Sequence, residues 1–302
     1  MSISKELDLK DGVQSVPLDE RLFSLDNEAA EFFKSQTGII DDEELKKHIL
    51  DVQAKAYRVY PYPCIRILSF LKLRVSRTLA YKSVLNLGQE RNRPIFLDIG
   101  CCFGSDIRKV VADGWPIQDV VASDLRAEFW KYGHDLFRST PDTFPAAFVP
   151  GDAFDPGILA PRDLFFEQPR SPPPDLKSLK SLNPLQGHVS AIHASSFFHL
   201  FSEEKQLELT RNVATLLSPT PGSIIFGSQV GEPMKRIRTV VTSGDAHSML
   251  CHSPESWAEL WNGQVFPKGT VHVETSLQET GPNPVFKTEE AVYYLHYRVR
   301  RL

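Results

Sequence analysis

The sequence predicts an α/β protein whose sheet is mainly parallel and ends in an antiparallel hairpin. An apolar run over 95–99 leads through a glycine-containing turn into a helical pattern over 106–113, the strand–turn–helix unit of such folds. A second apolar run, 120–124, ends in an acidic residue. Segments 270–279 and 291–300 alternate apolar and polar residues, as the strands of a hairpin do. A hairpin that follows a series of strand–helix units predicts a mixed sheet with an antiparallel edge.

Length and composition limit the class of protein. The 302 residues suffice for one large domain, or for one domain with an appended segment. Apolar residues make up 41% of the chain and charged residues 24%, as in globular proteins. The net charge of −4 gives no sign of a nucleic-acid-binding surface.

The cysteines and the apolar runs indicate the compartment. Four cysteines form neither a disulfide framework nor a zinc-binding spacing: Cys64, Cys101, Cys102 and Cys251. Residues 1–10 lack the apolar core of a signal peptide, and no apolar run reaches the ~18 residues of a membrane span. We therefore expect a reduced, cytoplasmic protein without a membrane span.

The N-terminal part predicts helices before the first strand. Residues 1–40 form a polar lead, and the acids at 41–44 open a helix that should end near Tyr60, because Pro61 and Pro63 follow. A further helix is expected over about 65–85. The connector between them is rich in tyrosine and arginine. It either staples the N-terminal helices to the main domain or forms a lid over a ligand.

The rest of the chain continues the strand–helix series. The expected elements are a helix over 126–137, a short strand from 147, an insertion or mobile loop at 156–187, a strand over 189–193, a capped helix over 202–217, a strand over 223–227 and a capped helix over 253–261.

The glycine turn at 100–104 predicts a cofactor site. Gly100 and Gly104 allow a sharp turn and a close approach of the backbone to a ligand, and Asp124 follows about 20 residues later, where a ribose-binding carboxylate is expected. The spacing differs from that of the dinucleotide fingerprint, and Asp98 would repel a pyrophosphate. A carboxylate attracts a cation, so the charge pattern favours S-adenosylmethionine, which carries a sulfonium and an ammonium. A tight turn without a ligand is the plain alternative.

Two further strand ends carry polar groups. Asp152 could accept a hydrogen bond from the exocyclic amine of adenine while Phe154 covers a ring face. His193 and His199 belong to the polar-aromatic segment that follows a buried strand, and either could contact a ligand or simply complete the core. No spacing resembles a metal-binding motif, so no metal is expected.

With these residues in place, the chain from about residue 40 onward resembles the class I S-adenosylmethionine-dependent methyltransferases. It is similar, more narrowly, to fungal secondary-metabolite methyltransferases, some of which esterify a carboxyl group in meroterpenoid pathways. The segments that carry the resemblance are 97–109 with Asp113-Gly114, 60–65, 123–125, 151–152 and 195–201.

The resemblance implies a Rossmann-like fold with a central mixed seven-stranded sheet and an antiparallel C-terminal hairpin. It divides the chain into an N-terminal helical lid (1–90) and a methyltransferase domain (91–302). By position, it implies that the cofactor is held by Asp98, Gly100, Asp124, Leu125, Asp152 and Ala153. We add Cys101, Gly104, Phe154 and His193 to that set from their places at the strand ends.

The expected activity is methyl-ester formation on a carboxylate of a small apolar acid. A carboxylate is already ionised at neutral pH and needs no general base, which agrees with the lack of an obvious catalytic pair. Expected substrate contacts are Tyr57, Arg58, Tyr60, Phe197, Phe198, His199, Gln229 and His247, with Met249 and Trp257 as apolar walls.

Two other functions share this fold. One is methylation of a phenolic or enolic hydroxyl with His193 or His199 as the base, and the other is a non-catalytic binding protein. An NAD-dependent reductase is disfavoured by the glycine spacing and by Asp98. The sequence leaves a homodimer open and does not identify the acceptor.

Overall fold

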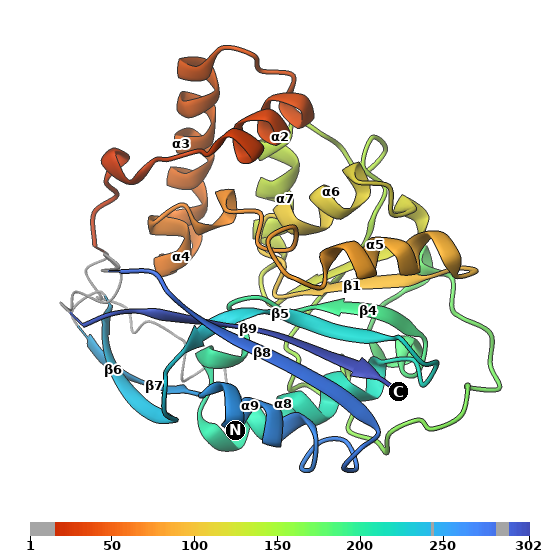
Figure 1. The fold of residues 1–302 in the computed structure, drawn as a ribbon. Coiled ribbons are helices and arrows are strands. Elements are labelled where there is room, and N and C mark those ends of the chain that lie inside the picture. Colours follow the sequence, from red (N-terminus) through yellow and green to blue (C-terminus); the bar gives the residue numbers. More distant parts are fainter. Residues whose placement is uncertain (1–15, 243–244, 282–289) are drawn as a thin grey trace.

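A seven-stranded mixed sheet forms the centre of the computed structural model, which describes residues 16–242, 245–281 and 290–302 (Figure 1). The strand order is β3-β2-β1-β4-β5-β9-β8. The strands are β1 (Ile95–Ile99), β2 (Val120–Asp124), β3 (Ala147–Pro150), β4 (Val189–His193), β5 (Ile224–Gly231), β8 (Val271–Glu279) and β9 (Tyr293–Arg301).

Strands β1 to β5 run parallel, and β9 runs antiparallel to both of its neighbours, β5 and β8. The last strand of the chain therefore lies inside the sheet, and β8 forms the edge. This confirms the predicted mixed sheet with antiparallel C-terminal strands.

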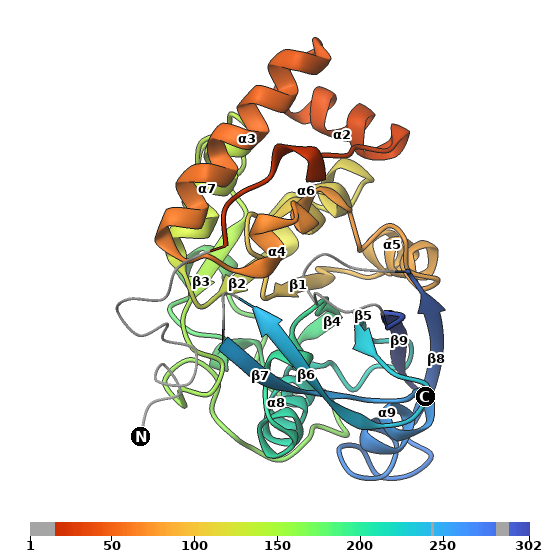
Figure 2. The same cartoon turned by 90° about the vertical axis from the view of Figure 1, so that its left-hand side faces the viewer.

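Helices cover both faces of the sheet (Figure 2). One face is covered by α5 (Tyr81–Glu90), α6 (Ser105–Ala112) and α7 (Ala127–Leu136), and the other by α8 (Glu203–Leu216) and α9 (Pro254–Trp261). The alternation within β1 shows the reason: Phe96 packs with Trp115 and α6, whereas Leu97 and Ile99 pack with α8 and α9.

The N-terminal segment builds a smaller core of its own against α7. It contains η1 (Glu20–Leu22), α2 (Asn27–Thr37), α3 (Asp42–Val59), α4 (Pro63–Arg66) and η2 (Ser69–Leu71). Its buried residues pack with Phe103, Phe129 and Phe137 of the main domain. Helix α3 begins after Asp41, whose carboxylate caps it, and ends at the residue before Tyr60, as predicted.

Two N-terminal predictions are wrong. The polar lead contains α2, which Asp26 caps at its start and Gly38 ends with a φ of +71°. The single helix expected over 65–85 is broken, because Leu68 and Leu73 adopt positive φ angles of 55° and 43°. Helix α5 begins only at Tyr81.

The segments after β3 follow the prediction in outline. Residues 156–187 contain only two single turns, η4 (Leu176–Ser178) and η5 (Asn183–Leu185), yet they bury leucines in the core. Helix α9 has the expected cap, since Ser253 and Ser256 form a capping box. Helix α8 lacks it, because the Ser202 side chain makes no capping bond.

A two-stranded sheet that the sequence analysis did not predict follows β5. It consists of β6 (Arg236–Thr242) and β7 (Asp245–Cys251), which pair antiparallel. None of the described helices is long and apolar enough to cross a membrane.

Candidate active site

The carboxyl ends of β1, β2, β3 and β4 meet at one edge of the sheet, where open α/β folds bind ligands. The register pairs Ile99 with Ser123 and Asp98 with His193. The turn after β1 is held to β2 because the N–H groups of Gly100 and Cys101 donate to the Ser123 carbonyl, at 2.8 and 3.1 Å. The local sequence thus brings the predicted cofactor residues together.

Asp124 supports the glycine turn from the end of β2. Its Oδ2 accepts a hydrogen bond from the N–H of Cys102 at 2.8 Å, and its Oδ1 accepts one from the N–H of Arg126 at 3.0 Å. Burial raises the pKa of Asp124, and these two backbone bonds act in the opposite direction. Each oxygen has a second lone pair, so the carboxylate can also accept from ligand hydroxyls.

Asp98 is buried on β1 with one oxygen paired and one not. Its Oδ1 lies 2.8 Å from Nδ1 of His193, and its Oδ2 has no hydrogen-bond partner among the described residues. A buried carboxylate oxygen without a donor is costly. Asp98 therefore offers a free acceptor at the sheet edge.

His193 extends this pair into a short relay. Its Nε2 lies 2.8 Å from Oγ of Ser195, which also accepts a bond from the N–H of Ser228 at 3.1 Å. Burial lowers the pKa of His193, but the charge of Asp98 and its hydrogen bond raise it by more, so the net shift is upward. The contact between His193 and Asp98 ties β4 to β1.

These residues fit S-adenosylmethionine. The unpaired Oδ2 of Asp98 suits an ammonium group, and Asp124 suits the hydroxyls of a ribose. The turn has no room for a side chain at position 100: a Cβ there would lie 2.8 Å from the Phe197 ring, and Gly100 has a φ of +74°. Within the described residues, no cluster of three or more His, Cys, Asp or Glu side chains could hold a metal ion.

The end of β3 carries the expected adenine-site residues. Oδ1 of Asp152 accepts a bond from the N–H of Phe154 at 2.9 Å. The Phe154 ring packs edge-on against Phe201 at 5.0 Å, with the Lys205 ammonium 4.7 Å from its centroid. The Lys205 ammonium thus occupies one face of the Phe154 ring. The four other predicted cofactor residues differ in exposure: Leu125 is exposed, Ala153 is partly buried, and Cys101 and Gly104 are buried.

The tyrosine-rich connector anchors the N-terminal segment and contacts a residue that follows β2. The Tyr57 hydroxyl donates to the carbonyl of Val16 at 2.8 Å, which is an anchoring contact. The Arg126 guanidinium lies 4.1 Å from the centroid of the Tyr60 ring, which stands 4.2 Å from that of Tyr62. Tyr60 therefore lies close to the segment that holds Asp124. Arg58 is exposed on α3.

Several expected substrate contacts lie in the core instead of on a pocket wall. Phe198 is fully buried against Trp257 and Trp261, and Gln229 is only 1% exposed. His199 accepts a bond from the N–H of Val230, and burial, together with the charge of Arg74, lowers its pKa to about 3. The side chains of these three residues lie on the buried side of their helix or strand. The sequence alone did not indicate which side would be buried.

The remaining expected contacts fall in different places. Phe197 is partly buried and lies against Gly100, at the cofactor turn. Met249 packs with the small cluster around Val230 and Cys251. His247 lies in β7, but its side chain is outside the described residues.

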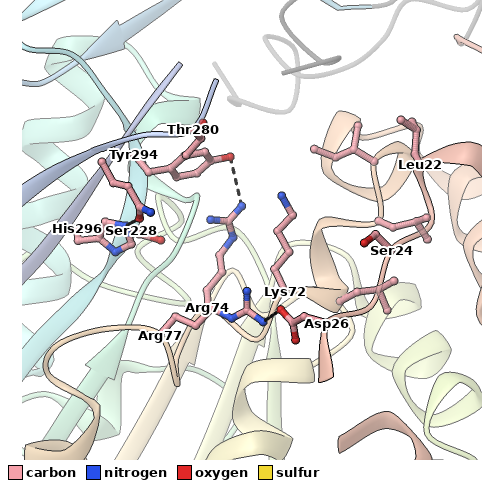
Figure 3. Close-up of a pocket in the computed structure, with 14 residues that line it drawn as sticks. Leu22, Ser24, Asp26, Lys72, Arg74, Arg77, Ser228, Thr280, Tyr294 and His296 are labelled. Atoms are coloured by element: carbon pink, nitrogen blue, oxygen red, sulfur yellow. Dashed lines mark hydrogen bonds and ion pairs between the residues drawn. The ribbon is translucent and has the colours of Figure 1, made fainter. Parts of the chain in front are cut away.

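A cavity of about 680 Å³ lies between the N-terminal segment and the C-terminal strands (Figure 3). It is lined by Leu22, Ser24, Asp26, Ile67, Leu68, Leu71, Lys72, Arg74, Arg77, Ser228, Gln278, Thr280, Tyr294 and His296. None of these residues was a predicted contact. A sequence signal was present in the three basic residues Lys72, Arg74 and Arg77, but the expected continuous helix concealed it.

The strand order, the glycine turn and the acidic strand ends define a class I methyltransferase fold. Residues 18–71 match the family model of the meroterpenoid methyltransferase N-terminal domain. The O-methyltransferase atr3 of Stereocaulon alpinum is 34% identical over 192 residues, which are 64% of this chain and 49% of atr3. The asnovolin E/chermesin D methyltransferase nvfJ of Aspergillus novofumigatus is 32% identical over 207 residues, covering 68% of this chain and 66% of nvfJ.

A third relative, the O-methyltransferase phiE of a fungal species, is 29% identical and covers 82% of this chain and 74% of phiE. Among solved structures, the 1,6-didemethyltoxoflavin-N1-methyltransferase of Burkholderia thailandensis aligns with 84% of this chain and 89% of its own, at 15% identity and a TM-score of 0.48. The chain is thus similar to fungal methyltransferases, and its N-terminal part is similar to that of the meroterpenoid methyltransferases. Its match spans about half the length of atr3.

Proposed function

We propose that this protein transfers a methyl group from S-adenosylmethionine to the carboxylate of a small apolar acid of the meroterpenoid type, which gives a methyl ester. The similarity to fungal methyltransferases supports methyl transfer as the reaction. The observation that carries the choice of a carboxylate is the state of the two histidines near the sheet edge, because an acceptor hydroxyl would need a base and a carboxylate does not.

Neither histidine is suited to take a proton from a substrate. His199 has a pKa of about 3, because burial and Arg74 disfavour its charged form, and its Nδ1 already accepts from Val230. His193 is engaged at both ring nitrogens, by Asp98 and Ser195. Neither of these nitrogens is therefore open to a proton of the substrate.

The residues of this chain would act by binding and orientation. When bound, S-adenosylmethionine supplies a methyl group on a positively charged sulfur, which is already a good leaving group. Asp98 would bind the ammonium, Asp124 the ribose, and Asp152 with Ala153 and Phe154 the adenine. Alignment of the carboxylate oxygen, the methyl carbon and the sulfur can lower the barrier by roughly 7–11 kcal/mol.

We also propose that residues 1–90 act as a lid on the 91–302 domain and that the enzyme works in the cytoplasm. The N-terminal residues share a core with α7, and the tyrosine connector lies over the segment after β2, which supports a covering role. The contribution of Tyr60 to substrate binding is part of this proposal, and so is that of Phe197.

The test uses a panel of apolar acids and the matching phenols, incubated with S-adenosylmethionine at pH 6 to 8.5. We expect methyl esters from the acids, at a rate that stays nearly constant because the carboxylate is ionised throughout. His199→Gln should keep the rate within about threefold, whereas removal of a general base costs about 10²-fold or more. A methylated phenol whose formation requires His199 or His193 would contradict the proposal.

A further inference from the structure

The cavity between the N-terminal segment and strands β5, β8 and β9 contains two cations without a carboxylate partner. Arg77 lines it too, but forms an ion pair with Asp26. For Lys72 and Arg74, by contrast, the described residues provide no ion pair with an acid. In Figure 3 both side chains extend from the floor into the open space of the cavity.

Arg74 is held in place while part of its guanidinium stays available. Its Nη2 donates to Oγ of Ser69 at 3.0 Å and to the Tyr294 hydroxyl at 3.3 Å, and the group lies 4.7 Å from the centroid of the Tyr294 ring. Nη1 and Nε have no described partner. An arginine oriented in this way can bind a carboxylate with two parallel hydrogen bonds.

The charge of the cavity is unusual for this chain. Three cations and one acid line it, whereas the whole protein carries a net charge of −4. Its only histidine, His296, has a pKa that burial lowers, with Arg74 acting in the same direction, so the ring is neutral at pH 7. The cavity therefore favours an anion.

The wall formed by the N-terminal segment contributes four apolar residues, Leu22, Ile67, Leu68 and Leu71. In Figure 3, Leu22 lies across the cavity from Tyr294 of strand β9. The volume of about 680 Å³ lies within the range for small-molecule sites. A molecule that combines an apolar body with one anionic group matches both walls.

The cavity adjoins the proposed methyl-donor site. Ser228 lines it, and the N–H of Ser228 donates to Ser195, which contacts His193, the partner of Asp98. The charge of Arg74 also acts on the pKa of Asp106, on the helix that starts at the glycine turn. The carboxylates of the donor site are not among the lining residues.

We propose that this cavity is the acceptor site and that Arg74 and Lys72 bind the carboxylate of an apolar acid there. The inference rests on the proposed function, because it names the site at which that acid binds. One guanidinium edge fixes the orientation of the carboxylate, and Lys72 adds a second positive charge. The N-terminal segment, through Leu22, holds the apolar body.

The experiment is an equilibrium titration of the full chain with cis-parinaric acid, an apolar carboxylic acid that fluoresces once it leaves water, and with its methyl ester. It needs no turnover, so its outcome is separate from that of the methylation assay. The variants are Arg74→Gln, Lys72→Gln and the double variant. Lys55→Gln, an exposed lysine of α3, removes the same charge elsewhere and is the control.

We expect the wild-type chain and the control to bind the acid at least tenfold more tightly than the ester. Arg74→Gln should reduce this preference at least threefold, and the double variant should abolish it. Binding of S-adenosylhomocysteine should change less than twofold in all variants. The proposal is overturned if the acid does not bind saturably or if Arg74→Gln leaves the preference for the acid unchanged. It is also overturned if Arg74→Gln weakens S-adenosylhomocysteine instead, since Arg74 would then hold the carboxylate of the donor.

Discussion

The unpaired oxygen of Asp98 gives the sharpest prediction about the donor site. Asp98→Asn keeps the shape of the side chain and an acceptor for His193, but removes the negative charge that the ammonium of S-adenosylmethionine would meet. A hydrogen bond to a charged group contributes about 1.5–3 kcal/mol, so the dissociation constant of S-adenosylhomocysteine should rise about 10- to 100-fold. Asp98 is only 3% exposed, so its interaction with the ammonium should contribute more free energy than an ion pair on the surface does.

The assay is isothermal titration with two ligands. S-adenosylhomocysteine has the ammonium, whereas 5′-methylthioadenosine has the same nucleoside without the amino acid part. We expect Asp98→Asn to weaken the first and to leave the second within about twofold. Equal weakening of both ligands would mean that the substitution had damaged the fold, and no weakening of either would refute the role assigned to Asp98.

Two further predictions concern stability. Gly133→Ala should destabilise the protein by about 1–3 kcal/mol, because the new Cβ would lie 2.2 Å from the backbone oxygen of Phe103. Urea unfolding would measure this loss. An unchanged midpoint would show that α7 can shift away from Phe103. His252 is buried beside Ser256, and burial lowers its pKa from 6.5 to about 4, so its contribution is present above pH 6.5 and lost as the pH falls toward 4. Through this residue the unfolding free energy should thus fall by about 2 kcal/mol between pH 7 and pH 5. The loss should be absent from His252→Gln. An equal loss in both proteins would mean that other groups cause it.

The strands and their ends could be predicted from the sequence because their signals are local. The glycines of the 100–104 turn, the acid that ends β2 and the apolar run of β1 each fix one element, and parallel pairing then brings Asp98, Asp124 and His193 to one edge. Their spacing in the chain is enough to predict the site.

The acceptor side could not be predicted in the same way. Residues 65–85 have a helical pattern, but Leu68 and Leu73 adopt positive φ angles and are buried in the core that the N-terminal segment shares with the main domain. The break turns Arg74 toward Tyr294, which lies 220 residues further along the chain. Likewise, Phe198 and His199 have the composition of a binding turn, but they pack beneath it with Trp257 and Val230. In both places, contacts between segments that are distant in the chain determine where the side chains lie.

The most direct test of the account is to determine where the methyl group goes. The purified protein would be incubated with S-adenosylmethionine carrying a trideuterated methyl group and with the apolar acid that binds best, and the product would be treated with mild base. We predict a product that gains one labelled methyl group and loses it on saponification, as a methyl ester must. A labelled methyl group that survives saponification would place the transfer on a hydroxyl or carbon atom and would contradict the account.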